Sequence, residues 1–260
     1  MAPVEIDGNA ITGATIDGTD VQEITVDGDV VFSAAPDGAF APSGTLLANY
    51  PMNEGSGTSV ADNTNNEPTF SVSGANWVNN SNFVGGTALD FDGSNDEMDF
   101  NGTFSFNNFG QFTDEFSIMF TVDFDSVATD QNILASGPNS TNSTYDRLGF
   151  GIGPSDPGEL VIIAEGLSGS NTVIGSHSIT TGLHRVGFRL DMGSSASVIV
   201  DKSVGTNGGN VRRAPVGGTF VGSRNGLHFL NGTIDNIVAY DGVINQTVID
   251  EDFDAQPWTP

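Results

Sequence analysis

The stretch that decides the fold class is FSIMFTVDF, Phe116 to Phe124. Apolar side chains recur in it at every second residue, which is the repeat of a β-strand and not of a helix. We therefore expect the alternate apolar side chains to face a core; they are Phe116, Ile118, Phe120, Val122 and Phe124. The opposite face, which we expect to contact solvent, carries Ser117, Met119, Thr121 and Asp123.

The same alternation recurs further along the chain. HRVGFRLDM, residues 184–192, places three apolar side chains on one face and leaves Arg185, Arg189 and Asp191 for the solvent face. Gly, Asn, Asp and Ser separate runs of this kind, as they do in proteins built from short strands. Further strands are predicted at 159–166, 197–203 and 233–240.

One short helix is expected near the C-terminus. Asn245 precedes QTVIDEDF, residues 246–253, and Asn is a favoured helix N-cap residue. Runs that could form long amphipathic helices are scarce elsewhere. Many short strands with one short helix predict an all-β protein whose main part is a two-sheet antiparallel sandwich.

The N-terminal segment has a different pattern. Asp-Gly recurs at a spacing of ten, at Asp7-Gly8, Asp17-Gly18 and Asp27-Gly28, each time after Ile or Val. Asp-Gly between β-branched residues is a strong signal for a hairpin turn. We predict a small β-meander over residues 1–34 that acts as a docking or oligomerisation module, or alternatively a decorated edge of the main domain. Residues 35–45, rich in Ala, Pro, Gly and Ser, are interpreted as a linker.

From Leu46 to Trp258 the chain resembles the laminin-G-like, concanavalin-A-type jelly rolls. The resemblance is carried at the start by Tyr50, Glu54 to Thr58, Asp62, Asn65, Asn66, Trp77 and Leu89 to Asp96, and at the end by Gly232 to Asp250. It implies a jelly-roll sandwich over residues 46–260, with ligand sites on rim loops.

Composition restricts the partners. The 260 residues carry 33 Asp and Glu against 7 Lys and Arg, so the formal net charge is −26, and Lys202 is the only lysine. Such a surface repels phosphates, so we expect neither nucleic acid nor an anionic membrane as a partner. The acidity fits a protein from a high-salt milieu, where screening removes the self-repulsion, or a calcium-loaded extracellular protein.

Other classes of chemistry lack their sequence signals. There is no cysteine, so thiol catalysis and disulfides are excluded. The glucanases that share this fold class place Glu-x-Asp-x-x-Glu on one strand. The nearest run here, DEMDF from Asp96 to Phe100, has acids at Glu97 and Asp99 but lacks the third. We therefore expect no catalytic residues and no enzyme, with a glucanase-type hydrolase as a minor alternative.

Calcium is the cofactor that the sequence suggests. Residues 90–99, DFDGSNDEMD, hold five acids and an Asn around a predicted turn, and Ca²⁺ prefers such oxygen ligands. Calcium binding at a rim is common in the family that the chain resembles. The resemblance implies Asp92, Asp96 and Asp235 as its ligands. The competing interpretation is a solvated hairpin in an acidic surface.

The opening residues MAPVEIDGNA have no basic or apolar region of the kind that a secretory signal needs. A sandwich of this type usually works outside a cell, and a virus particle reconciles the two observations. Repeated Asp-Gly turns at the start also resemble the docking ends of tailed-virus structural proteins. The sequence thus predicts a virion protein of a halophilic tailed virus, located in the tail, fibre, baseplate or capsid spike.

In this interpretation residues 1–34 bind other virion proteins or sister subunits, and the chain forms a homo-oligomer. The sandwich then binds a host surface glycan or glycoprotein, or stabilises the particle. The alternative is a cellular carbohydrate-binding or adhesion protein, located extracellularly or at the cell surface.

Overall fold

The computed structural model describes most of the main domain and short pieces of the N-terminal segment. The described residues are 5–6, 9–10, 15–16, 19–20, 23–26, 29–33, 46–79, 82–99, 115–128, 130–137, 147–154, 156–165, 171–191, 195–207, 218–223 and 228–256. The predicted linker, 35–45, lies outside them.

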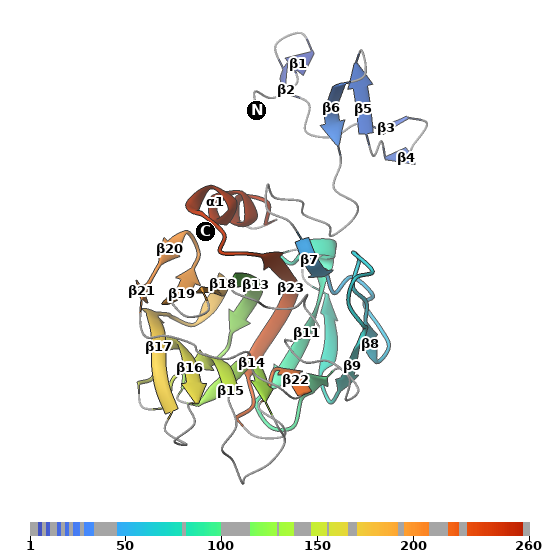
Figure 1. The fold of residues 1–260 in the computed structure, drawn as a ribbon. Helices are drawn as coiled ribbons and strands as arrows, with labels where there is room; N and C mark the ends of the chain where they lie inside the picture. The colour runs from blue at the N-terminus through green and yellow to red at the C-terminus, as the bar shows by residue number, and fades with distance from the viewer. Residues whose placement is uncertain are drawn as a thin grey trace.

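Two antiparallel sheets form the main domain, which confirms the all-β sandwich (Figure 1). The back sheet has the order β10-β11-β23-β13-β18-β19-β20, and β7 also pairs with β23. Its strands are β7 Leu46–Tyr50, β10 Asn76–Asn79, β11 Thr87–Asp92, β13 Glu115–Phe124, β18 Gly182–Asp191, β19 Ser195–Val200, β20 Ser203–Val204 and β23 Asn231–Asp241.

The front sheet has the order β21-β17-β16-β15-β14-β22-β12-β9-β8. Its strands are β8 Ser59–Val60, β9 Phe70–Ser73, β12 Glu97–Asp99, β14 Gln131–Gly137, β15 Arg147–Ile152, β16 Glu159–Glu165, β17 Asn171–Ser178, β21 Thr206–Asn207 and β22 Gly218–Val221. A short 3₁₀ helix, η1 Val84–Gly86, precedes β11.

The core lies between the inward faces of the two sheets. Phe120 and Phe188 from the back sheet both contact Phe150 from the front sheet, with ring centroids 5.8 and 4.8 Å apart respectively. All three rings are fully buried. The inward face predicted for residues 116–124 is therefore confirmed, because its alternate apolar side chains belong to this core.

The outward face of the back sheet is not the solvent face that alternation predicted. Ser117, Met119 and Thr121 of β13 are completely buried, and so is Arg185 of β18. The prediction was wrong for these residues because a helix covers this face. Met119 belongs to a second apolar cluster, whose other buried members are Ile199, Val238, Tyr240, Ile244, Val248 and Ile249.

That helix is α1, Gln246–Asp254, and its existence and start were predicted correctly. Asn245 has an extended backbone and its side-chain oxygen accepts the N–H of Val248, at 3.1 Å. Val248 and Ile249 are buried against the sheet. Among the described residues, no helix has the length and apolarity that a bilayer crossing requires.

Three hairpins occupy the N-terminal segment. Their strands are β1 Glu5–Ile6 with β2 Asn9–Ala10, β3 Thr15–Ile16 with β4 Thr19–Asp20, and β5 Glu23–Val26 with β6 Asp29–Ser33. The pairings Ile6 with Asn9, Ile16 with Thr19, and Val26 with Asp29 enclose one Asp-Gly each. The predicted turn positions agree with this register. Among the described residues of this segment, each hairpin forms its own two-stranded sheet.

Candidate functional site

Strand register gathers several short connections at one end of the sandwich. At this end Phe124 pairs with both Gly182 and Gly232, and Asp92 pairs with Asn231. Leu46 of β7 pairs with Tyr240 at the opposite end of β23. We call the former end the distal rim. Its described residues are 92–97, 125–128, 130, 156–158, 179–181 and 228–231.

One buried side chain links the connections of the distal rim. Gln131, only 7 % exposed, donates its amide N–H groups to the carbonyl oxygens of Ser126 and Ala128, at 3.2 and 3.0 Å. Its amide oxygen accepts the backbone N–H of Asn231, at 2.9 Å. All polar positions of this amide thus tie the 125–128 turn to the start of β23.

Backbone hydrogen bonds extend the same set of connections. The N–H of Gly158 donates to Val127 O, and the N–H of Ile179 donates to Gly158 O, each at 2.9 Å. Three turns from separate parts of the chain are therefore joined in series. Hydrogen-bonded turns on a packed sandwich hold their exposed side chains in fixed positions, which is what recognition of a small polar ligand requires.

The rim also carries a His–Asp pair with unusual backbone. His228 Nδ1 lies 2.6 Å from Asp130 Oδ2, and the side chains are 23 % and 46 % exposed. Both residues have positive φ, +56° and +69°, a region that non-glycine residues seldom adopt. Asn132 N–H donates to His228 O at 2.9 Å. Such strained positions persist where surrounding contacts hold them, and they cluster at functional sites.

A second histidine borders the rim. Thr180 Oγ1 lies 3.2 Å from His184 Nε2, and His184 Nδ1 lies 3.1 Å from Asp201 Oδ2. Asp201 Oδ1 also accepts the backbone N–H of Arg185. The 179–181 turn is thereby connected through His184 to Asp201 in the turn that follows β19, and through Asp201 to the backbone of β18.

The predicted calcium ligands do not form one site. Asp92 and Asp96 share a turn at the distal rim, where Asp92 N–H donates to Asp96 Oδ2 at 2.7 Å and Ser94 N–H donates to Asp92 Oδ1 at 2.9 Å. Asp235 lies elsewhere, in β23 opposite Thr121. Within the described ranges, no three His, Asp or Glu side chains gather closely enough to hold a metal ion.

Asp96 has a structural position in this turn. It is 3 % exposed, and a Cβ on Gly74 would lie 2.2 Å from its Oδ1, so only glycine fits beside it. Burial raises its pKa, the carboxylates of Asp92 and Asp90 raise it further, and the N–H of Asp92 opposes them. An inaccessible carboxylate that accepts a backbone N–H suits calcium poorly. A site at Asp92 and Asp96 would need ligands beyond these two.

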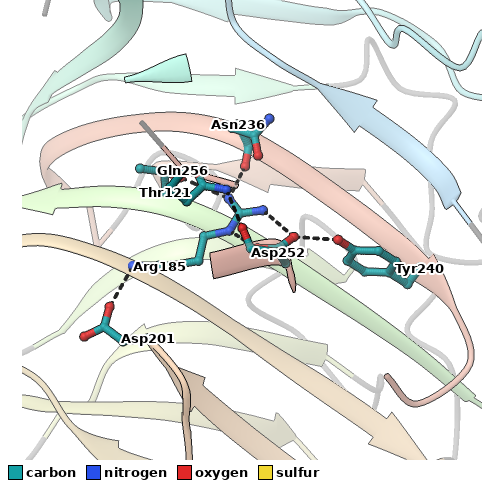
Figure 2. A network of polar contacts seen from close by, with 7 residues as sticks. All are labelled: Thr121, Arg185, Asp201, Asn236, Tyr240, Asp252 and Gln256. Atoms are coloured by element: carbon teal, nitrogen blue, oxygen red, sulfur yellow. Dashed lines mark hydrogen bonds and ion pairs between the residues drawn. The ribbon is translucent and has the colours of Figure 1, made fainter. Parts of the chain in front are cut away.

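The outward face of the back sheet contains a buried ion pair that the sequence analysis missed (Figure 2). Arg185 donates from Nε to Asp252 Oδ1 at 2.5 Å and from its second terminal nitrogen to Asp252 Oδ2 at 3.0 Å. Its remaining terminal nitrogen donates to Thr121 Oγ1 and to the carbonyl of Asn236. Both charged side chains are 0 % exposed.

The network fastens α1 to the sheet. Tyr240 donates its hydroxyl to Asp252 Oδ2, and burial together with Asp252 raises the pKa of that phenol. Thr121 Oγ1 donates to Gln256 Oε1, while Gln256 Nε2 donates to Asp252 O. Asp235 shares this sheet face, because it pairs with Thr121 of β13. These side chains are enclosed, so they position α1 on the sheet and offer no surface to a ligand.

A further buried carboxylate organises the loop after β8. Asp62, 5 % exposed, accepts the backbone N–H groups of Asn49, Thr64, Asn66 and Glu67 at 2.7 to 3.1 Å. Its Oδ2 also accepts the hydroxyl of Thr64 at 2.6 Å. One carboxylate therefore closes the loop onto β7.

Glu67 lies half-buried beside this carboxylate. Burial, with the charge of Asp62 adding, raises the pKa of Glu67 to about 7. Burial and the same two carboxylates also raise the pKa of Tyr50, whose hydroxyl donates to Pro68 O. Because the pKa of Glu67 lies near neutral pH, the stability of the fold should depend on pH in this range. The cluster contacts β7 and is not part of the distal rim.

Comparison with known proteins supports the fold. No family model matches the chain, and no curated protein matches it. Domain 4 of AbnA, an extracellular arabinanase of family GH43 from Geobacillus stearothermophilus solved with arabinotriose, is similar with a TM-score of 0.60 at 14 % identity. The match covers 80 % of this chain and 98 % of that domain.

Two further solved structures resemble the chain over parts of their lengths. A Trypanosoma rangeli sialidase in complex with 2,3-difluorosialic acid gives a TM-score of 0.61 at 18 % identity, over 86 % of this chain and 35 % of the sialidase. The receptor-binding domain of botulinum neurotoxin mosaic serotype C/D gives a TM-score of 0.58 at 9 % identity, over 82 % of this chain and 51 % of that domain. The chain thus spans about a third of the sialidase and half of the toxin domain. At these identities the likeness shows a shared β-sandwich fold.

Proposed function

We propose that the sandwich is a non-enzymatic glycan-binding domain and that the distal rim is its recognition surface. The observation that carries this proposal is the Gln131 linkage, which joins the 125–128 turn to the start of β23. Backbone hydrogen bonds of Gly158 and Ile179 join two further rim turns to it. Sugars are bound through many hydroxyl groups, so a rim whose acceptors and donors are already ordered loses little entropy on binding. The arabinanase domain, whose whole length the fold matches, was solved with arabinotriose, which supports a glycan as the ligand class.

Asp130 and His228 are the rim side chains that we assign to ligand contact. Their pairing orients the carboxylate and the imidazole, and each retains an exposed fraction of its side chain. Together they offer an acceptor and a donor to neighbouring hydroxyls of a sugar ring.

A binding role is favoured over hydrolysis by the state of the rim carboxylates. Glycosidases require two accessible carboxyl groups about 5 to 10 Å apart, one with a raised pKa. Asp96 has the raised pKa at this rim, but it is buried and accepts a backbone N–H. Asp123, whose pKa burial and Asp125 also raise, lies on β13 beside His184. The proposal is therefore binding without catalysis.

A glycan array with the intact chain in about 1 M salt tests the glycan-binding proposal, with salt chosen to screen the net charge. We expect a defined glycan class to bind, and Asp130→Asn and His228→Asn to weaken binding about tenfold or more. Asn tolerates positive φ, so both replacements keep the backbone conformation. Asp254→Asn on α1 is the control and should bind normally. Equal binding by all variants, or binding to no glycan, would contradict the proposal.

We further propose that the carrier of this domain is a virion protein of a halophilic tailed virus. The three hairpins ahead of the sandwich and the net charge of −26 support it, and a cellular adhesion protein is the alternative. Mass spectrometry of density-purified particles tests this separately. If the chain is present in the particles at stoichiometric amounts, the virion assignment is supported. If it is absent from the particles and is found on host cells instead, the alternative is supported.

A further inference from the structure

Asn236 of β23 has a buried side-chain amide in an unusual backbone position. The residue is 1 % exposed, and within the part of the chain that the structure describes neither its amide nitrogen nor its amide oxygen has a hydrogen-bond partner. Its φ is +41°, in the left-handed region that residues other than glycine seldom adopt. We propose that this amide binds an ordered internal water molecule, which makes Asn236 a hydration site inside the fold.

The pairing of β23 with β13 is irregular at this residue. Met119 of β13 pairs with Val238. Two residues later along β13, Thr121 pairs with Asp235, which lies three residues back along β23. β23 therefore has one residue more than β13 in this interval, which is the arrangement of a β-bulge. A bulge interrupts the ladder and re-aims side chains, so Asn236 is placed where regular pairing does not supply its partners.

The opposite edge of β23 changes its partner at the same place. β11 pairs with β23 as far as Ile234, where Leu89 lies opposite. β7 pairs with β23 from Ile237 onward, where Tyr50 lies opposite. Asn236 lies between these two pairings, so the ladders on both edges of β23 are irregular around it. Buried polar groups that a ladder does not pair are commonly satisfied by ordered water.

The surroundings of Asn236 are polar. Arg185 donates to its carbonyl oxygen at 2.6 Å, and the same guanidinium nitrogen donates to Thr121 Oγ1 (Figure 2). The preceding residue, Asp235, is 0 % exposed. An internal water is stable where it finds two to four polar partners, and the amide of Asn236 provides a donor and an acceptor side by side. A buried amide without any partner would instead lose the hydrogen bonds that it makes to solvent in the unfolded chain.

The chemistry of the amide favours water over a metal ion. A cation would be held by the amide oxygen and would leave the N–H donors of the same amide without a partner. It would also lie near the guanidinium of Arg185, which bonds to the carbonyl of this residue, and like charges repel. Water donates to the oxygen and accepts from the nitrogen, so it meets both requirements.

This hydration site has a consequence for the buried ion pair. The carbonyl that accepts the N–H of Arg185 belongs to Asn236, and Arg185 in turn binds Asp252 of α1. A water bound to the amide of Asn236 holds the bulge in place and with it this carbonyl. The bulge therefore contributes to the position of the guanidinium, and through it to the position of α1.

A high-resolution crystal structure of the full chain tests the proposal directly. We expect a water oxygen within about 3.2 Å of the amide nitrogen or the amide oxygen of Asn236. An amide that bonds only to protein groups, with no water beside it, would overturn the proposal. So would a bound ion with six or more oxygen ligands at about 2.3 to 2.6 Å, because that geometry belongs to calcium.

Oxygen-17 relaxation dispersion of the solvent gives a second test, because it counts the long-lived internal waters of a folded protein. Asn236→Leu has a side chain of similar shape without polar atoms, so we expect the count to fall by at least one. Gln246→Ala removes an exposed amide on α1 and is the control, which should keep the count of the parent chain. An unchanged count in folded Asn236→Leu would contradict the proposal.

The crystallographic test needs no variant, so it decides the question even if Asn236→Leu fails to fold at its positive φ. Neither measurement involves a glycan or the distal rim. Failure of the hydration site and failure of the glycan proposal are therefore distinguishable.

Discussion

Arg185 of β18 and Asp252 of α1 form a two-point ion pair with neither side chain exposed to solvent, 67 residues apart in the chain. Tyr240, Thr121 and Gln256 bond to the same pair. The pair fixes where the C-terminal helix lies on the back sheet. A buried ion pair contributes position more than net stability, since desolvation offsets much of the attraction.

Removing one partner of this pair should be strongly destabilising. Asp252→Asn leaves the guanidinium of Arg185 buried without a counter-charge, and we expect a loss of about 3 to 5 kcal/mol in the free energy of unfolding. Denaturant titration in high salt measures it. Asp254→Asn removes the exposed ion pair with Lys202 on the same helix and should cost less than about 1 kcal/mol. Equal effects of the two variants would contradict the account.

Stability should fall as pH rises from about 4.5 to about 7 because of Glu67. Its pKa is raised from 4.5 to about 7 in the folded chain, so folding favours the protonated carboxyl. That contribution is complete below the unfolded pKa and is lost as pH rises through about 7. Thermal unfolding across this range should show the decline in the parent chain and a smaller decline in Glu67→Gln.

Glu54→Gln is the control for the pH experiment, because Glu54 lies in the same region but bonds to Ala61 N–H in an exposed position. It should keep the decline of the parent. If Glu67→Gln retained the full pH dependence, the titration would have to come from another group.

Gln131 should be required for the order of the distal rim. Gln131→Ala leaves the carbonyls of Ser126 and Ala128 and the N–H of Asn231 without this partner, at a cost of about 1 to 3 kcal/mol. Amide hydrogen exchange should accelerate at 126–128 and at 231. The matched variant Gln246→Ala removes exposed amide bonds to Lys202 O and Asp250, and it should leave exchange at the rim unchanged.

The calcium prediction for Asp92 and Asp96 has a direct test. If calcium binds this turn, it should raise the melting temperature more than magnesium does at the same ionic strength. Asp92→Asn should abolish that difference, because it removes the charge of a proposed calcium ligand while its amide oxygen can still accept the N–H of Ser94. Superimposable melting curves in calcium, magnesium and chelator would refute calcium binding.

The acidic surface predicts that salt stabilises the fold. With a net charge of −26, self-repulsion is strong at low ionic strength and is screened at high ionic strength. The melting temperature should rise steeply up to about 1 M salt and by similar amounts in NaCl and KCl. A flat curve would remove the support that the charge gives to a high-salt origin.

Alternation in Phe116–Phe124 predicted the strand and its inward face, because a period of two is local information. It could not predict that Thr121 and Arg185 are buried, because the burial of the other face depends on α1. That helix begins 125 residues after Thr121, so its position is not local information. One signal was available. Asp252 falls on the buried stripe of α1 with Val248 and Ile249, and an acid at such a position calls for a buried cation.

The site was less accessible to sequence reasoning. Asp92 and Asp96 could be placed in one turn because they lie four positions apart in the sequence. Asp235 was predicted through resemblance as a ligand of the same calcium site, whereas register puts it opposite Thr121. Gln131 and the pair of Asp130 with His228 had no motif, since they converge only when strands distant in sequence are paired.

The measurement that tests the central claim most directly is amide hydrogen exchange on the full chain with and without a glycan that binds it. The account predicts slower exchange on binding at 125–131 and 179–182, at the distal rim, and unchanged exchange at 246–254 in α1. Protection confined to α1 or to the strand ends near Leu46, with the distal rim unchanged, would contradict the assignment of the recognition surface.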